Sequence, residues 1–245
     1  MYKNYFLFFS FFIITLSTFS QNYSEEKVFS WYDQKIGIEN TTLFQGIEYV
    51  ETDRMINEKH KFFETQEFQN GSVTYNGQTF YEVPLKYNIY DDLLLVNLKQ
   101  DQRNFIFQLI DNQVDQFQID ENKFRYLKAN NNSDILGFYE VINEEGAFKI
   151  FKKHLRNRME IRDRSVAYSE FNPADPDYIF QLKDEFFELD NRRDLFSKFP
   201  DLKSEIRGFY SKYRKQSRNN PDLFMKNLAN EINNLIPSAT NQIQE

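Results

Sequence analysis

The chain has 245 residues, with 37 acidic and 30 basic side chains and a formal net charge of −7. An acidic protein is a poor candidate for general nucleic-acid binding, because the phosphate backbone attracts lysine and arginine. The sequence contains no cysteine, which excludes disulfides, thiolate metal sites, cysteine nucleophiles and lipid attachment at an amino-terminal cysteine.

Residues 1–20 have the layout of a secretory signal peptide. Lys3 supplies a positive charge, residues 5–16 are nearly all Phe, Leu and Ile, and small residues precede Gln21. We expect cleavage before Gln21, with an uncleaved membrane anchor as the alternative. The apolar run is short for a bilayer span of about 20 residues. The sequence therefore predicts an exported protein, periplasmic or associated with the outer membrane, with no transmembrane span after cleavage.

The first segment of the mature chain, Gln21 to Lys35, is expected to be a strand or a loop. It holds Trp31, the single tryptophan of the chain. Large aromatic side chains such as tryptophan usually pack in the protein core. We therefore expect Trp31 to fill the core rather than to form a ligand platform. A short strand or a glycine-centred turn should follow between Leu43 and Val50.

The stretch Gly71 to Leu98 predicts strand, tight turn, long strand, turn and strand. Asn76-Gly77 tolerates positive φ at both central positions of a hairpin turn. Apolar residues then alternate with polar ones, as in a half-buried strand; they are Tyr81, Val83, Leu85, Tyr87 and Ile89. Pro84 lacks an amide donor, so this strand should lie at a sheet edge or carry a bulge.

Closely spaced strand patterns continue to about residue 190. Turn residues separate them at 111–112, 120–122, 143–146 and 183–185. Such spacing favours an antiparallel meander. Residues 21–190 should form this region as a curved open sheet or a partial barrel.

Helical spacing of apolar residues replaces alternation after Asn191. Asn191 and Asp201 are expected to cap the N-termini of two helices. Asn220-Pro221 places an N-cap residue before a proline at the first helical position, so a third helix should begin there and end at Pro237. The prediction is an α+β fold, with two to three carboxy-terminal helices (191–236) packed on the sheet within one domain. Residues 237–245 should form a flexible tail.

Catalytic chemistry has no recognisable motif. His60 and His154 lack the spacing of a zinc site; His60 should be solvated, and His154 should lie on a strand. Ser72 begins a strand without a nucleophile elbow. Three acidic pairs, at 91–92, 144–145 and 184–185, fall on expected turns. We expect no cofactor, no metal and no enzymatic activity, with a hydrolase using an unrecognised acidic site as a distant alternative.

A basic run offers a candidate interaction surface. Residues 21–147 carry 11 basic and 22 acidic side chains, whereas residues 148–245 carry 18 and 15. On a single strand, Lys152, His154, Arg156 and Arg158 would share one face. Such a row could bind an envelope or outer-membrane protein, an anionic lipid or lipopolysaccharide, or it could simply protect an edge strand. The candidate residues are Lys149, Lys152, Lys153, Arg156 and Arg158.

Two functions remain open besides the hydrolase. The chain holds 27 Phe and 15 Tyr, so a curved sheet could enclose an apolar or lipid ligand and act as a periplasmic carrier. The same rings could instead fill the space between sheet and helices. The leading prediction is a non-enzymatic cell-envelope protein that acts as an accessory subunit for a protein partner.

Three stretches resemble a group of uncharacterised exported proteins of Bacteroidota-type bacteria. They are the signal ending Phe19-Ser20-Gln21, the segment from Gly71 to Asn88, and Leu195-Phe196-Ser197-Lys198-Phe199-Pro200. The resemblance covers much of the mature chain as a pattern of strand and helix signals. It implies an envelope location, and no functional residues are carried over from it.

Overall fold

The protein is described here from a computed structural model that places residues 25–100, 102–130, 134–163 and 166–241. The expected signal peptide and the end of the expected tail lie outside these residues. Within them, no helix has the length and apolarity needed to cross a membrane.

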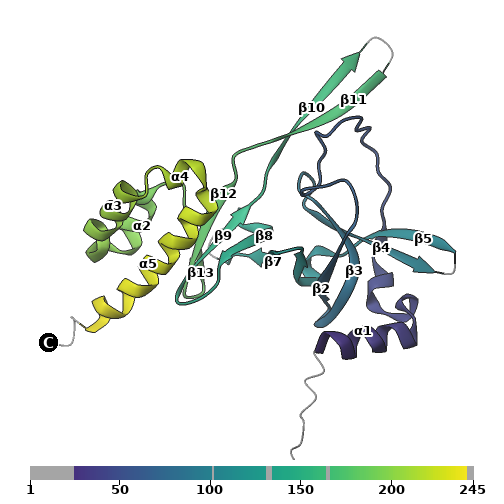
Figure 1. Ribbon diagram of the computed structural model, residues 1–245, viewed down its shortest axis with the longest axis horizontal. Coiled ribbons are helices and arrows are strands. Elements are labelled where there is room, and N and C mark those ends of the chain that lie inside the picture. The colour runs from purple at the N-terminus through teal and green to yellow at the C-terminus, as the bar shows by residue number, and fades with distance from the viewer. Residues whose placement is uncertain (1–24, 101, 131–133, 164–165, 242–245) are drawn as a thin grey trace, which may run out of the picture.

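An antiparallel sheet of 11 strands dominates the described chain, and helices follow it (Figure 1). The strand order is β1-β5-β4-β3-β2-β6-β7-β8-β9-β12-β13, which leaves two free ends. The predicted α+β class, with a meander-like sheet and carboxy-terminal helices, is confirmed, and the sheet is open. Its strands are β1 (Ile47–Glu48), β2 (Gln69–Tyr75), β3 (Gln78–Asn88), β4 (Leu93–Gln100), β5 (Arg103–Gln108), β6 (Val114–Ile119), β7 (Asn122–Lys128), β8 (Leu136–Asn143), β9 (Phe148–Lys153), β12 (Asp177–Leu182) and β13 (Glu185–Glu188).

The turn at Asn76-Gly77 has the predicted conformation, with φ of 51° and 75°. The long strand β3 is central rather than an edge, because β2 and β4 pair with its two sides. Its register with β2 shifts between Phe80 and Val83, before Pro84, and Glu82 has a φ of 54°. The bulge prediction is therefore correct. The bulge changes the alternation, so that Phe80 rather than Tyr81 is buried.

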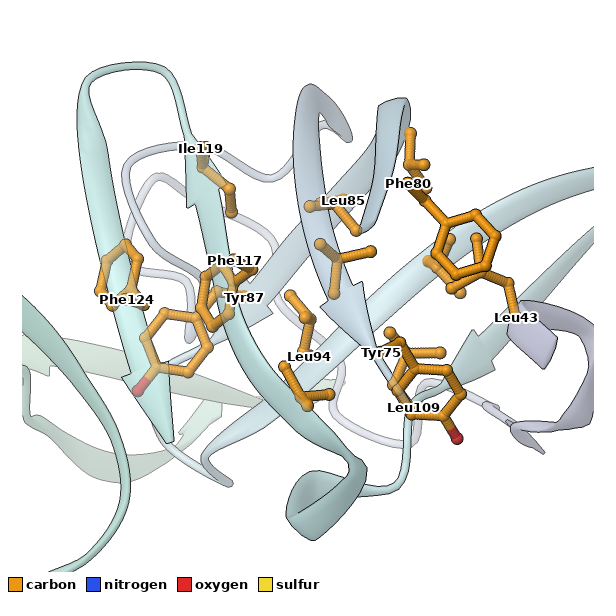
Figure 2. Close-up of a cluster of buried hydrophobic side chains, with 14 of the residues drawn as sticks. Leu43, Tyr75, Phe80, Leu85, Tyr87, Leu94, Leu109, Phe117, Ile119 and Phe124 are labelled. Atoms are coloured by element: carbon orange, nitrogen blue, oxygen red, sulfur yellow. The ribbon is translucent and has the colours of Figure 1, made fainter. Parts of the chain in front are cut away.

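One face of strands β2 to β7 forms the first hydrophobic core. Figure 2 shows side chains from these strands converging on one another, with Tyr87 beside Phe117 and Phe124. The rings of Phe117 and Phe124 stack with centroids 4.7 Å apart, and the Tyr87 ring contacts both. Aromatic pairs of this kind are worth about 0.5–1.5 kcal/mol beyond the area that they bury. The predicted aromatic interior is a packed core here.

A second core joins the carboxy-terminal helices to β9 and β12. Asn191 forms a capping box at the start of α2, and Asn220 Oδ1 accepts a hydrogen bond from Leu223 N at the start of α5. Asn233 of α5 bonds to both the amide and the carbonyl of Phe148, at 2.8 Å each. The helices are α2 (Arg192–Lys198), α3 (Lys203–Lys212), α4 (Gln216–Asn219) and α5 (Pro221–Asn241).

Four local predictions in these regions are wrong. Residues 25–36 form helix α1 (Glu25–Ile36) rather than a strand or loop, and Trp31 is 60% exposed. Lys35 in its last turn complements the helix dipole. Asp201 does not cap α3, which begins after a 3-10 turn. Helix α5 continues past Pro237, because proline weakens a helix without always ending it.

Candidate interaction surface

A two-stranded hairpin leaves the sheet between β9 and β12. Its strands are β10 (Arg156–Asp163) and β11 (Val166–Pro173), and within the described part of the chain they pair as strands only with each other. Strand β9 ends at Lys153, which lies opposite Asp177 of β12. Strands β9 and β12 therefore pair directly with each other at the base of the hairpin. Figure 1 shows the hairpin extending away from the sheet and the helices. We call β10 and β11 the arm.

The two faces of the arm differ in chemistry. Residues directly opposite each other in an antiparallel pair share a face. Ile161 lies opposite Tyr168, and Met159 and Val166 fall on the same face. Glu160, Arg162 and Ala167 lie on the other face, which is mostly polar. The first face also carries Asp163 opposite Val166 and Glu170 opposite Met159. We call its four apolar residues, Met159, Ile161, Val166 and Tyr168, the apolar face.

The apolar face is only partly covered by the described residues. Met159 is 54% exposed, whereas Ile161, Val166 and Tyr168 are each partly buried. None of the four belongs to the three hydrophobic clusters of the described chain. A hairpin of two strands is marginally stable on its own in water, so the arm depends on how its base is held.

The base of the arm is held by an irregular segment, residues 50–68, which connects β1 to β2. The amides of Ser169 and Phe171 donate hydrogen bonds to the carbonyls of Arg54 and Lys59, at 2.9 and 2.8 Å. Arg158 forms an ion pair with Asp53 at 2.8 Å. These contacts attach β11 and β10 to the 50–68 segment.

Lys61 lies beneath this junction and is only 2% exposed. Its Nζ contacts carboxylate oxygens of Glu51 and Asp53 at 2.9 Å and of Asp91 at 3.3 Å. Burial lowers the pKa of Lys61, but the hydrogen bonds that it donates to Asp53 and Glu51 outweigh burial, so the net pKa is raised. Lys61 is therefore a charged centre that joins the base of the arm to the β3–β4 turn.

His60 is buried beside Lys61, at 5% exposed, so the prediction of a solvated side chain is wrong. Its Nδ1 accepts a hydrogen bond from Phe62 N at 3.3 Å. Burial, with a further contribution from Arg156, lowers its pKa below 6.5. The neighbouring charged residues Glu58, Lys59 and Lys61 predicted a solvated loop. The prediction failed because sequence alone does not show that the 50–68 segment packs under the arm.

The structure divides the basic run instead of aligning it on one strand. Lys152 and Lys153 end β9, His154 lies between strands, and Arg156 begins β10. The prediction that Lys152, His154, Arg156 and Arg158 alternate along one strand is therefore wrong. The break follows from the chain leaving the sheet for the arm.

Most cations of the candidate surface have internal partners. Lys152 pairs with Asp222 at 2.8 Å, and Lys153 pairs with Asp92 at 2.6 Å. Arg156 donates to the carbonyl of Phe62 at 3.3 Å, and Arg158 pairs with Asp53. Lys149 is partly exposed on β9, facing Gln181 of β12. A partner for this surface stays a prediction, but four of its five cations stabilise the fold.

His154 belongs to a polar network between the sheet and α5, which sequence reasoning missed. His154 Nε2 lies 2.6 Å from Glu140 Oε2, and Lys152 links Glu140 to Asp222. The hydroxyl of Tyr178 donates to Asp222 at 2.5 Å. No sequence signal connects residues so far apart along the chain. The arrangement joins β8, β9 and β12 to the start of α5.

Neither a metal centre nor a nucleophile emerges from these groups. Among the described residues, no cluster of three or more His, Asp or Glu side chains is placed to hold a metal ion. Ser72 lies within β2, opposite Gln118, and lines a shallow depression of about 350 Å³ together with Glu82. The acidic pair at 91–92 lies on the turn after β3, where Asp92 accepts hydrogen bonds from Tyr87 and Phe138 N. These carboxylates have structural partners.

No family model matches the chain, and no curated protein and no solved structure matches it either.

Proposed function

We propose that the protein is an exported cell-envelope protein that binds a protein partner through the apolar face of its arm. The observation that carries the proposal is an amphipathic hairpin that projects from the sheet with its apolar face only partly covered by the described residues. Tyr168 and Met159 are residue types enriched at protein interfaces.

The chemistry of the arm favours a protein over a lipid surface. Anionic membranes attract clusters of lysine and arginine, whereas the described arm mixes signs, with Arg162 beside Glu160 at 3.1 Å. A narrow apolar strip with an adjacent strand edge fits an apolar groove or an exposed strand on another protein. The partner proposed is an envelope or outer-membrane protein with such a groove.

The anchored base supports a binding role, because it limits the ordering cost of association. Arg158, Asp53 and Lys61 fix the arm to the 50–68 segment and the β3–β4 turn. A connection of this length without regular structure is uncommon in compact domains unless it serves a function. A pre-organised arm retains more of its contact energy as affinity. The envelope location itself rests on the amino-terminal sequence.

Site-specific photo-crosslinking in the native envelope tests the proposal. A photoreactive amino acid at Met159 should give one stoichiometric adduct, whereas the same group at the exposed Lys203 of α3 should give none. Replacing the apolar face with polar residues, Ile161→Thr with Tyr168→Ser, should abolish recovery of that partner.

The matched control changes the opposite face of the arm. Arg162→Ser with Ala167→Ser should leave partner recovery unchanged, since both residues lie away from the apolar face. Equal loss of the partner from both double variants, or no loss from either, would contradict the proposal.

A further inference from the structure

A cavity of about 230 Å³ lies between strands β3 to β5 and the 50–68 segment. It is on the side of β3 opposite the first core, because Lys86 alternates with the buried Leu85 and Tyr87. Lys86 pairs in register with Leu95 of β4, and Tyr49 N bonds to the Ile106 carbonyl at 2.8 Å. The apolar lining consists of Tyr49, Met55, Phe62, Phe68, Leu95 and Ile106.

Lys86 is the charged group of this cavity that lacks a matching charge. Its Nζ lies 4.7 Å from the ring centroid of Phe62 and 4.2 Å from that of Phe68. Among the described residues, no carboxylate comes within ion-pair distance of this nitrogen. Burial lowers the pKa of Lys86, and Glu67 and Glu51 counteract it only in part. Lys61, by contrast, has three carboxylates around it.

The acidic residue that lines the cavity is already engaged elsewhere. Glu51 accepts from Lys61 Nζ at 2.9 Å, from the Tyr49 hydroxyl at 2.9 Å and from Asp53 N at 2.8 Å. It therefore does not neutralise Lys86. Its negative charge would also repel a ligand that carried two negative charges, so the cavity is suited to a monoanion.

We propose that this cavity binds the carboxylate end of a medium-chain fatty acid, with the carboxylate on Lys86 and the acyl chain against the aromatic rings. An apolar lining with one unmatched cation complements an amphiphilic monoanion in both shape and charge. The volume is below the usual range of about 300–1,000 Å³ for drug-sized ligands, which favours a single unbranched chain. The inference is independent of the partner proposed for the arm.

Calorimetric titration with octanoate and with octanol tests the ligand class. The full-length protein should bind octanoate, and octanol should bind more weakly because it lacks the charge. Lys86→Met should weaken octanoate binding about tenfold to a hundredfold, the range expected for one charge-assisted hydrogen bond. Lys86→Arg retains the cation and should keep most of the affinity.

Matched controls separate this site from general effects. Lys128→Met removes an exposed lysine of β7 and should leave octanoate affinity unchanged. The arm variant Ile161→Thr with Tyr168→Ser should also bind octanoate normally, so a failure here and a failure of the arm proposal are distinguishable. If Lys86→Met does not fold by circular dichroism, Met55→Trp, which fills the cavity, should block octanoate instead.

Three results would overturn the inference. They are no octanoate binding to the folded protein, equal affinity for octanol and octanoate, and unchanged octanoate affinity in folded Lys86→Met.

Discussion

Strand β3 and the arm share the same kind of pattern but have opposite surroundings. In β3, the side chains of Phe80, Leu85 and Tyr87 are at most 1% exposed, because neighbouring strands bury that face. In the arm, Met159 is 54% exposed, and no described cluster includes its apolar neighbours. Alternation therefore shows which side chains share a face, but not what covers that face.

The largest effect should come from truncating the covered face. Phe117→Ala removes a ring that is 1% exposed and stacks on Phe124. We expect it to lower the free energy of unfolding by about 3–5 kcal/mol, measured by urea denaturation. Phe117→Leu keeps more of the volume and should cost less. A small effect of Phe117→Ala would show that this core is not tightly packed.

An intermediate effect should come from the anchor between the two regions. Asp53→Asn removes one carboxylate from Lys61 and the partner of Arg158. Because Lys61 retains Glu51 and Asp91, we expect a cost of about 1–3 kcal/mol, below that of isolating a buried charge. Hydrogen exchange at the amides of Ser169 and Phe171 should accelerate.

The anchor also predicts a pH dependence. Burial raises the pKa of Asp53, but Lys61 and then Arg158 lower it more, so the net pKa lies below 3.8. A carboxylate with a lowered folded pKa stabilises the protein above its unfolded pKa, and the stabilisation is lost as pH falls through the folded value. The stability difference between wild type and Asp53→Asn should therefore be constant near neutral pH and shrink below about pH 4.

The exposed ion pair of the arm should matter less than this anchor. Glu160→Gln, which breaks the pair with Arg162, should change the free energy of unfolding by less than about 0.5 kcal/mol in urea denaturation.

The smallest effect on stability should come from the partly covered apolar face of the arm. Tyr168→Ala truncates a ring outside the hydrophobic clusters of the described chain, so the free energy of unfolding should change by about 0.5 kcal/mol or less. A cost above about 2 kcal/mol in urea denaturation would mean that the arm packs on the fold, which would remove the contrast with β3.

Much of the local structure was predictable from short stretches. Asn76-Gly77 specified its hairpin turn, Asn191 its capping box and Asn220 the start of α5. These signals act within a few residues, because they depend on backbone φ and on side chains that reach the nearest amides. The order of most strands follows from such turns.

The candidate surface was less predictable. The basic run was visible, but its partners Asp53, Asp92 and Asp222 lie far away in the sequence. The exposure of Trp31 and the burial of His60 were also misjudged. Each depends on which distant segment packs against the residue, and a single sequence carries no direct signal of such contacts.

The sequence by itself therefore determined the turns, the helix starts and the faces on which apolar residues gather, since steric and hydrogen-bonding preferences act locally. Only the tertiary structure decided which of those faces is buried and which cations are neutralised. Burial and charge pairing arise between segments that meet only when the chain folds. That is why the apolar face of the arm and the unmatched Lys86 became visible only in the folded molecule.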